Sequence, residues 1–544
     1  MVQTKNPQNK IALLILAVFA VISLLWSVFI PVFESPDEST DYEFGRYYGR
    51  TWKLPVLTDN PRPQGVHFWE PLYFYILGSV SKAINAPLSE DSKYMYSSSD
   101  QWKRLREQHP LNLHRHEPSE FKFNWDEIAW SLHLMRLVSV LLSVGSVWFV
   151  YKMGREVFPE PSWLPIAGMM LFAFNPQFLF LGSALNVVDM VIFSTAILLW
   201  LLVRFMKRKV NKAIDIIVLG ASMGMAILSK MTALPILAVA VVGICWKRIV
   251  EKKPVVNAIL LFLIIFLLTG GWYLLRNQAL YGELTGAKIH VLARFGKMTN
   301  PFLEEVGLLN FLISYPKTQW KTFWSGFGWI TIYLPMIFPF TMLMIYAHGI
   351  WGFVVAIRER TNIFLNGVQK RQLMVLAMAP IVVWLAISRV IFIVEVFHGK
   401  DLFPVSGAAA LIVVVGWRTM WEIFGSSDWD RGWIKKLSMP VIFLLSIFWF
   451  KQPELARFFK GIANMTDVWR MIGTGILAAI ALKVFWKLVS NQRSREIFRK
   501  LVVNKENQIA LLILGIIAIS ELAILFLMVV QGLYNMSIRE LLRI

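Results

Sequence analysis

The sequence predicts an all-α polytopic membrane protein, and three observations lead to this fold class. Of the 544 residues, 56% are hydrophobic and only 17% are charged, whereas a soluble domain carries roughly a quarter charged residues. The mean hydropathy is +0.54. Apolar segments of roughly 17 to 25 residues recur along the chain, which is the length that a helix needs to cross a bilayer. This composition excludes a string of soluble domains, and a single cysteine, Cys245, excludes a disulfide scaffold.

About thirteen transmembrane helices are expected from these apolar runs. Only Lys230 separates the fifth from the sixth, and Pro235 favours a tight helical hairpin there over one long helix. No small-residue cleavage site follows the first run, which is therefore expected to be a retained helix rather than a signal peptide. The expected spans are 11–31, 132–151, 163–182, 187–203, 213–229, 231–246, 255–275, 325–357, 372–395, 402–417, 437–450, 467–486 and 508–533.

The distribution of Lys and Arg predicts how the helices are oriented. With the N-terminus in the cytoplasm, every short cytoplasmic loop is basic, from 152–162 to 487–505, and the short outer turns contain almost no positive charge. This asymmetry follows the positive-inside rule and places the C-terminus outside. It also accounts for the net charge of +20, so that membrane lipids, and no nucleic acid, are the expected partners.

Two long outer loops, 32–131 and 276–324, interrupt the spans of what is expected to be one membrane-embedded domain, 1–544. Loops of this length are usually functional. In the first loop, the aromatic stretches 42–53 and 67–84 are expected to form helices that lie in the outer interface. A further crossing at 67–84 would invert the charge pattern of every later loop.

The chemistry is expected at the outer ends of the spans, because the chain contains no nucleotide-binding or hydrolase motif of a soluble domain. An ionisable residue at the end of a span is by default a candidate functional residue. The sharpest group is Pro36-Asp37-Glu38, which follows the first span. The same residues would also make a good helix N-terminus, so capping is the simpler alternative.

Further polar residues lie at other outer span ends, on the side expected for Asp37. Five of them have a simpler alternative. Asn186 and Asp189 could cap a helix, Lys230 and Lys400 could snorkel to headgroups, and Arg276 could be an interface anchor. Arg136, inside the second span, is expected to be buried in an ion pair or to snorkel. The candidates are Asn186, Asp189, Lys230, Arg276, His398 and Lys400.

In their order along the chain, Pro36-Asp37-Glu38 and six longer stretches of the sequence resemble the GT-C superfamily of integral-membrane glycosyltransferases. Within it, the chain is similar to bacterial relatives of protein O-mannosyltransferases and aminoarabinose transferases. Asp41 stands where such sequences often have His, and Lys400-Asp401 stands where they often have Arg-Tyr. The matching pieces are Pro36-Asp37-Glu38, HFWEPLYFYILGSVSKA at 67–83, ALNVVDMVIFSTAILLWLLVR at 184–204, GMAILSKMTALPILAVAVV at 224–242, GGWYLLRNQALYGELTG at 270–286, TFWSGFGWITIYLP at 322–335 and HGKDLFPVSGAAAL at 398–411.

The resemblance implies a transferase in a bacterial plasma (inner) membrane. It would move a hexosyl or pentosyl group, with inversion, from a polyprenyl-phosphate donor to an extracytoplasmic acceptor. By similarity, Asp37 is the catalytic base, and Glu38 supports it or binds a divalent metal, Mg²⁺ or Mn²⁺. One base suffices, because phosphate is already a good leaving group, whereas glycoside hydrolysis uses two carboxyls.

The departing phosphate must meet a positive charge. Lys400 is the first candidate for this role, followed by Lys230 and Arg276. The resemblance also implies substrate-binding residues along the matching pieces. They are His67, Glu70, Asn186, Asp189 and His398.

Two other functions stay open. The first is a transporter or flippase for a lipid-linked glycan, a class that typically shows inverted repeats and a site near the membrane midplane. The candidate charges here gather at one face, which favours the enzyme. The second is a transferase similar to O-antigen ligases, which would use a diphosphate donor and would fit the same outer site.

Overall fold

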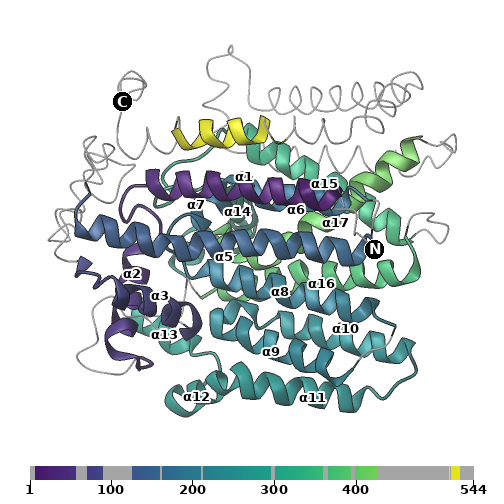
Figure 1. Cartoon of the computed structure of the whole chain (residues 1–544), viewed down its shortest axis with the longest axis horizontal. Helices are drawn as coiled ribbons and strands as arrows, with labels where there is room; N and C mark the ends of the chain where they lie inside the picture. The colour runs from purple at the N-terminus through teal and green to yellow at the C-terminus, as the bar shows by residue number, and fades with distance from the viewer. Residues whose placement is uncertain are drawn as a thin grey trace. The chain divides into compact units, whose positions relative to one another are not determined.

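All regular structure in the described part of the chain is helical. The computed structural model describes residues 7–56, 70–89, 125–159, 162–209, 212–295, 300–358, 365–393, 398–425, 514 and 516–526. Within these ranges there is no β-strand, only an isolated bridge between Phe327 and Ile332. The predicted all-α fold is therefore confirmed (Figure 1).

The described helices occur in the following order along the chain. They are α1 (Pro7–Phe29), α2 (Glu38–Thr51), α3 (Pro71–Ala83), α5 (Glu127–Val157), α6 (Leu164–Ala173), α7 (Pro176–Gly182), α8 (Val188–Lys207), α9 (Ala213–Ser229), η3 (Met231–Ala233), α10 (Ile236–Val250), α11 (Val256–Phe266), η4 (Leu267–Gly271), α12 (Trp272–Tyr281), α13 (Ala287–Phe295), α14 (Pro301–Trp324), α15 (Ile337–Arg358), α16 (Gly367–Val390), η5 (Gly399–Leu402) and α17 (Phe403–Gly425).

A multi-pass membrane protein is confirmed by these helices. Among the described residues, 8 helices are long and apolar enough to cross a membrane, or up to 9 if α6 and α7 together make one span. The predicted span 213–229 forms α9, a shorter apolar helix. The count of thirteen is not confirmed, and the predicted spans 437–450 and 467–486 lie outside the described residues.

Two predicted spans differ from the helices observed. The span 163–182 is bent by 64° between α6 and α7. Asn175 accepts hydrogen bonds from two N–H groups of α7, and Pro176 begins that helix, because proline lacks the N–H that would continue the preceding one. The span 325–357 yields a helix only from Ile337; turns with left-handed backbone at Gly328 and Ile330 precede it.

The chain divides into two compact units. The first comprises Met1–Tyr333, Gly367–Leu411 and Ile517–Ile544, and the second comprises Leu334–Asn366 and Ile412–Ile516. The predicted single domain stays a prediction. All candidate site residues belong to the first unit, and the following description concerns that unit.

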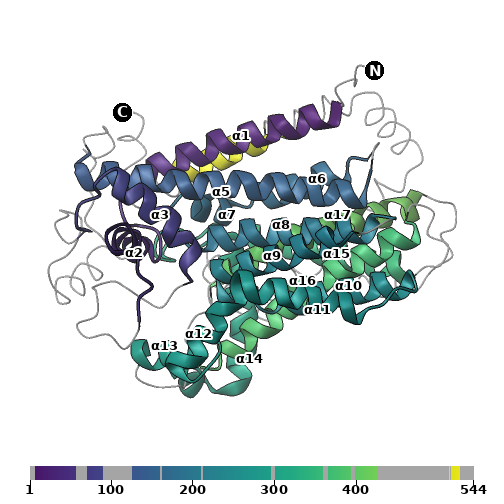
Figure 2. The ribbon, with the colours of Figure 1, turned by 60° about the horizontal axis from the view of Figure 1, so that its bottom comes forward.

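A row of neighbouring helices forms the frame of the first unit. α1 packs against α5, α5 against α8, α8 against α9 and α9 against α11, and both views show α1 beside α5 (Figures 1 and 2). α8 begins just after Asn186, and α10 begins just after Lys230 and η3. Both helices therefore start at candidate site residues and lead away from them through the apolar part of the unit.

The two helices predicted in the first outer loop are both present. α2 covers most of the predicted stretch 42–53, and α3 covers most of 67–84. They cross closely at two glycines, since a Cβ on Gly49 would lie 2.6 Å from the carbonyl oxygen of Gly78. Arg46 reinforces the contact by donating to the carbonyl of Ala86 at 3.0 Å. Their predicted place in the membrane interface stays a prediction.

Candidate active site

Asp37 lies at the start of α2 in a strained backbone conformation. Its φ is 69° and its ψ is −1°, in the left-handed region. This region costs an L-residue roughly 1–2 kcal/mol, although Asp adopts it more readily than most side chains, and such strain is concentrated at functional sites. The side chain makes no capping hydrogen bond to α2. The alternative in which Asp37 acts only as a helix cap is therefore wrong.

The short turn η5 carries the opposite charges. His398 begins it, and its Nδ1 accepts a hydrogen bond of 2.9 Å from the N–H of Lys400. The N–H of Gly399 donates to a threonine hydroxyl of α14 at 2.8 Å. A Cβ on Gly399 would lie 2.4 Å from the backbone nitrogen of Phe323, so only glycine permits this approach. α14 thus fixes the position of the two residues that follow, Lys400 and Asp401.

Two ion pairs join this turn to distant parts of the chain. Lys400 Nζ lies 2.6 Å from Oδ2 of Asp37, and Lys230 Nζ lies 3.1 Å from Oδ1 of Asp401. The lysine side chains are only 11% and 10% exposed, whereas that of Asp37 is 29% exposed. Neither lysine snorkels, so that alternative is wrong. These four residues are called the four-charge cluster below.

Glu38, next to Asp37, has a different environment. Its Oε1 accepts from Nε of Arg136 and from the N–H of Leu185, and its Oε2 accepts from Arg136 Nη2, each at 2.8 Å. Arg136 also donates to three carbonyl oxygens at the end of α1, at 2.7 to 2.9 Å. Both side chains are fully buried. The expectation of a buried ion pair for Arg136 is confirmed.

This environment bears on the metal predicted at Glu38. Both carboxylate oxygens already accept hydrogen bonds from a guanidinium, so Glu38 does not fit a metal ligand. Among the described residues, no group of three or more His, Cys, Asp or Glu could hold a metal ion. The predicted Mg²⁺ or Mn²⁺ stays a prediction.

Buried polar side chains lie beside the cluster. Asp41 Oδ2 accepts from the N–H of Val187 at 2.9 Å. Burial raises the pKa of Asp41 well above its usual value, and the negative charge of Asp37 raises it further. Asn186 accepts from a backbone N–H of α8, as the capping alternative expected, and its Nδ2 also donates to the carbonyl of Pro36 at 3.5 Å. Asn186 therefore ties the start of α8 to the segment that carries Asp37.

Asp189 occupies the first turn of α8 and is buried. Its carboxylate makes no capping hydrogen bond to the N–H groups of α8. The capping alternative for Asp189 is therefore wrong.

Glu70 and Arg276 lie on the side of Lys230. Glu70 precedes α3, and its Oε1 accepts from the N–H of Met231 at 2.9 Å. Burial raises the pKa of Glu70 from 4.5 to about 7. Arg276 donates to the carbonyl of Pro55 at 2.9 Å and lies over the ring of Tyr273. This arginine holds the segment at Pro55 and makes no hydrogen bond or ion pair with the four-charge cluster.

His398 is held in the neutral form. Burial, followed by the nearby positive charge of Lys400, lowers the pKa of His398 to about 3. Since Nδ1 accepts a hydrogen bond, Nε2 carries the proton of the neutral ring. Nε2 has no partner among the described residues, so it is a donor available to a bound molecule. The last predicted site residue, His67, lies outside the described residues.

Sequence reasoning overlooked two members of the site. Asp401, the partner of Lys230, and Asp41 were recognised only as departures from the pattern of similar sequences. An acidic residue directly beside Lys400 at the same span end was the available signal for Asp401. The position of Asp41 one helical turn after Asp37 was the signal for the second.

The arrangement supplies three chemical functions at one place. A partly exposed carboxylate can take a proton, two buried lysines can stabilise an added anion, and neutral donors such as His398 can orient a polar molecule. A phosphate can replace Asp37 as the partner of Lys400 once that carboxylate has taken a proton.

Comparisons with known proteins agree with this picture. Residues 130–272 match the family model described as dolichyl-phosphate-mannose-protein mannosyltransferase. The matched segment includes α5, α8, α9 and α10, which hold Arg136, Asp189 and Lys230 near the site. This match covers about a quarter of the chain and supports the resemblance to GT-C glycosyltransferases.

The solved structures that match the chain are distant from it in sequence. Two are structures of ArnT from Cupriavidus metallidurans, one bound to undecaprenyl phosphate and one in the apo state, at 12% and 13% sequence identity. Both have a TM-score of 0.43. Each match covers 97% of this chain, and 77% and 78% of the ArnT chain, respectively. A third is the oligosaccharyltransferase of Archaeoglobus fulgidus tethered with an acceptor peptide, at 12% identity and a TM-score of 0.43, covering 89% of this chain and 55% of that one. No curated protein matches the sequence.

Proposed function

We propose that this protein transfers a sugar from a polyprenyl-phosphate donor to an extracytoplasmic acceptor, and that the four-charge cluster is its active site. The observation that carries the proposal is the 2.6 Å ion pair between Asp37 and Lys400. It joins the residue best suited to accept a proton to the residue best suited to bind a phosphate. The name of the matched family refers to a dolichyl-phosphate donor, which supports a polyprenyl phosphate as the donor class.

Donor binding requires little polar surface on the protein. A polyprenyl chain partitions into the membrane and contributes about 0.8 kcal/mol per buried CH₂, so only the phosphate and the sugar need specific contacts. Lys400 and Lys230 are the cations nearest the proposed phosphate position, and Asn186 and His398 are suited to sugar hydroxyls. Glu70 lies beside Lys230, where a second substrate group would be bound.

The charges balance through the reaction. The hydroxyl of the acceptor attacks the anomeric carbon, its proton passes to Asp37, and the bond from that carbon to the phosphate oxygen breaks with inversion. Asp37 becomes neutral, while the phosphate changes from a diester with one negative charge to a monoester with two. Lys400 loses its carboxylate partner as the phosphate gains charge, so the lysine can exchange one anion for the other.

The test is transfer by the purified full-length protein in lipid nanodiscs. A labelled polyprenyl-monophosphate sugar is supplied with total envelope acceptors, and a polyprenyl-diphosphate sugar is supplied in parallel. Asp37→Asn is expected to lower turnover by a factor on the order of 10²–10⁴. Lys400→Gln is expected to weaken donor binding as well as turnover.

The matched control is Asp126→Asn, in the same outer loop. Asp126 caps α5 by accepting from the N–H of Ala129 at 2.8 Å, and Asn caps a helix equally well, so turnover is expected to be unchanged. Full turnover by Asp37→Asn would refute the role of that carboxylate. Transfer from the diphosphate alone would favour the O-antigen-ligase-like alternative, and movement of donor without transfer would favour the flippase.

A further inference from the structure

A cationic cavity lies at the other end of the helices that lead away from the site. α8 runs from Val188 to Lys207, and the segment from Met231 to Val250, which also has 20 residues, runs alongside it. At 1.5 Å per residue, each spans about 30 Å, which is the thickness of the apolar part of a bilayer. The cavity, of about 130 Å³, lies at these far ends, where α16 joins them.

The lining of this cavity is strongly positive. It contains five basic side chains and a single acidic one, Glu251. The apolar residues Met206, Val250 and Val368 complete the wall. The basic residues are Lys207, Arg208, Lys209, Lys247 and Arg371.

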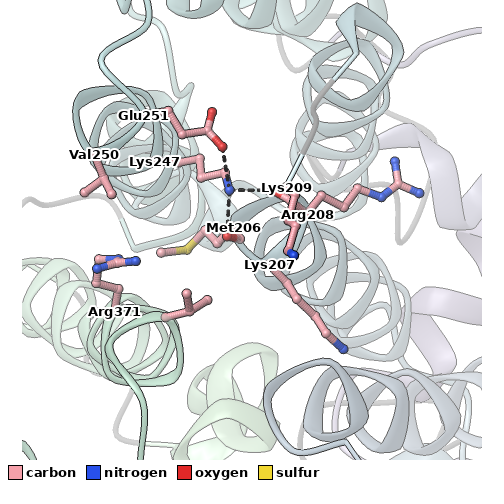
Figure 3. A pocket seen from close by; sticks show the side chains of 9 residues that line it. Met206, Lys207, Arg208, Lys209, Lys247, Val250, Glu251 and Arg371 are labelled. Atoms are coloured by element: carbon pink, nitrogen blue, oxygen red, sulfur yellow. Dashed lines mark hydrogen bonds and ion pairs between the residues drawn. The ribbon is translucent and has the colours of Figure 1, made fainter.

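One of these cations has a structural role. Lys247 Nζ lies 2.8 Å from Glu251 and donates to the carbonyls of Met206 and Arg208, at 3.1 and 2.5 Å. Figure 3 shows this amine between the carboxylate and the backbone at the end of α8. A cation at a helix C-terminus stabilises the exposed carbonyls there. Lys247 therefore holds α8 and α10 together and forms the floor of the cavity.

Two other cations are available for a ligand. Arg371 approaches from α16 (Figure 3) and lines the same cavity as Lys209, which follows α8. Neither has a hydrogen bond or an ion pair to any described residue. Lys207, by contrast, is paired with Glu156 at 3.1 Å, and Arg208 is paired with Asp215. The positive-inside rule explains why basic residues occur at this face, but it does not explain two unpaired cations directed at one cavity.

We propose that this cavity binds a phosphate group, supplied either by an anionic lipid headgroup or by soluble phosphate. The planar guanidinium of Arg371 can donate two parallel hydrogen bonds to phosphate oxygens, and the amine of Lys209 adds a second charge. Basic pockets between membrane helices commonly bind lipid phosphates. The apolar wall suits the glycerol part of a lipid. This site is separate from the four-charge cluster and does not depend on the proposed transferase reaction.

The experiment measures ligand binding to the full-length protein by native mass spectrometry. Three probes are used: phosphatidylglycerol, zwitterionic phosphatidylcholine, and inorganic phosphate. One surface cation is worth about fivefold in affinity, so Arg371→Gln is expected to weaken binding about fivefold. The double variant with Lys209→Gln is expected to weaken it about 25-fold. Neither residue has a partner among the described residues, so both variants are expected to fold.

The matched control is Lys252→Gln, which removes an exposed charge near the end of α10 and outside the cavity. Unchanged binding by this variant, together with the losses above, supports the site. Selective binding of phosphatidylglycerol assigns an anionic lipid as the source of the phosphate group. Binding of inorganic phosphate as tight as that of phosphatidylglycerol assigns soluble phosphate. Equal weakening by Lys252→Gln and Arg371→Gln in every arm would leave only general surface charge and would overturn the proposal.

Discussion

Glu38 and Asp37 are adjacent carboxylates, and we predict that removing the charge of Glu38 lowers mainly stability, whereas removing the charge of Asp37 lowers mainly turnover. Glu38→Gln leaves Arg136 buried without a counterion, although the amide can still accept from Leu185. Breaking a buried ion pair in this way costs about 3–5 kcal/mol of unfolding free energy. The folded fraction of Glu38→Gln is expected to retain turnover, whereas Asp37→Asn is expected to lose turnover at a smaller cost in stability, because the Asp37 side chain is 29% exposed.

Arg136→Met is expected to destabilise more than Glu38→Gln. It leaves a buried carboxylate and also orphans three carbonyl oxygens at the end of α1, at about 1–3 kcal/mol for each group left unsatisfied. The double variant removes both charges, so its cost is expected to fall short of the sum of the single costs by about 3 kcal/mol.

The assay is equilibrium unfolding in mixed micelles, followed by tryptophan fluorescence, alongside sugar transfer by the same preparations. Wild-type stability of Glu38→Gln together with lost transfer would refute the reasoning, since Glu38 would then act on the substrate. Strict additivity of the two single variants would show that the pair seen at 2.8 Å contributes no coupling energy.

Three further predictions follow from neighbouring features. Gly399→Ala is expected to displace η5 from α14 and to lower both the thermal midpoint and turnover, because overpacking costs about 1–3 kcal/mol; an unchanged midpoint would contradict the close approach. The folded protein holds a proton on Glu70 that the unfolded chain releases between pH 4.5 and about 7, so stability falls as the pH rises through this range. Glu70→Gln is expected to flatten this slope in unfolding titrations at pH 5 and 8, and an identical slope would contradict the raised pKa. Lys230→Gln is expected to raise the KM for the donor about tenfold with a smaller effect on kcat, and an unchanged KM would remove Lys230 from donor binding.

Local features of the sequence predicted the helices well. Apolar length predicted most spans, because a helix must satisfy its own backbone hydrogen bonds in lipid whatever its neighbours are. The errors occurred where side chains override hydropathy. The Asn175-Pro176 pair that bends the third predicted span is a typical helix start, and the turn with Gly326 and Gly328 before α15 is a typical helix break. Both could have been recognised in the sequence.

The sequence predicted which residues belong to the site, but it did not predict which lysine pairs with which carboxylate. Charge asymmetry placed Asp37, Lys230 and Lys400 on one side of the membrane, and the structure brings all three into one cluster. Which cation meets which carboxylate depends on how α14 positions η5, and this contact joins segments far apart in the sequence. The burial of Glu38 against Arg136 likewise arises only when α1 packs on α5.

Lys400 and Asp401 are consecutive, yet each is anchored to a different segment of the chain. A deletion of one residue just before Lys400 would rotate that turn by about 120° and place the aspartate where the lysine stands. The aspartate would then confront Asp37, and Lys230 would lose its carboxylate partner, so one attraction would become a repulsion and the other would be lost. The length of this turn is therefore constrained as strictly as the identity of its residues, and viable variants of this region should preserve the spacing even where they exchange one charged pair for another.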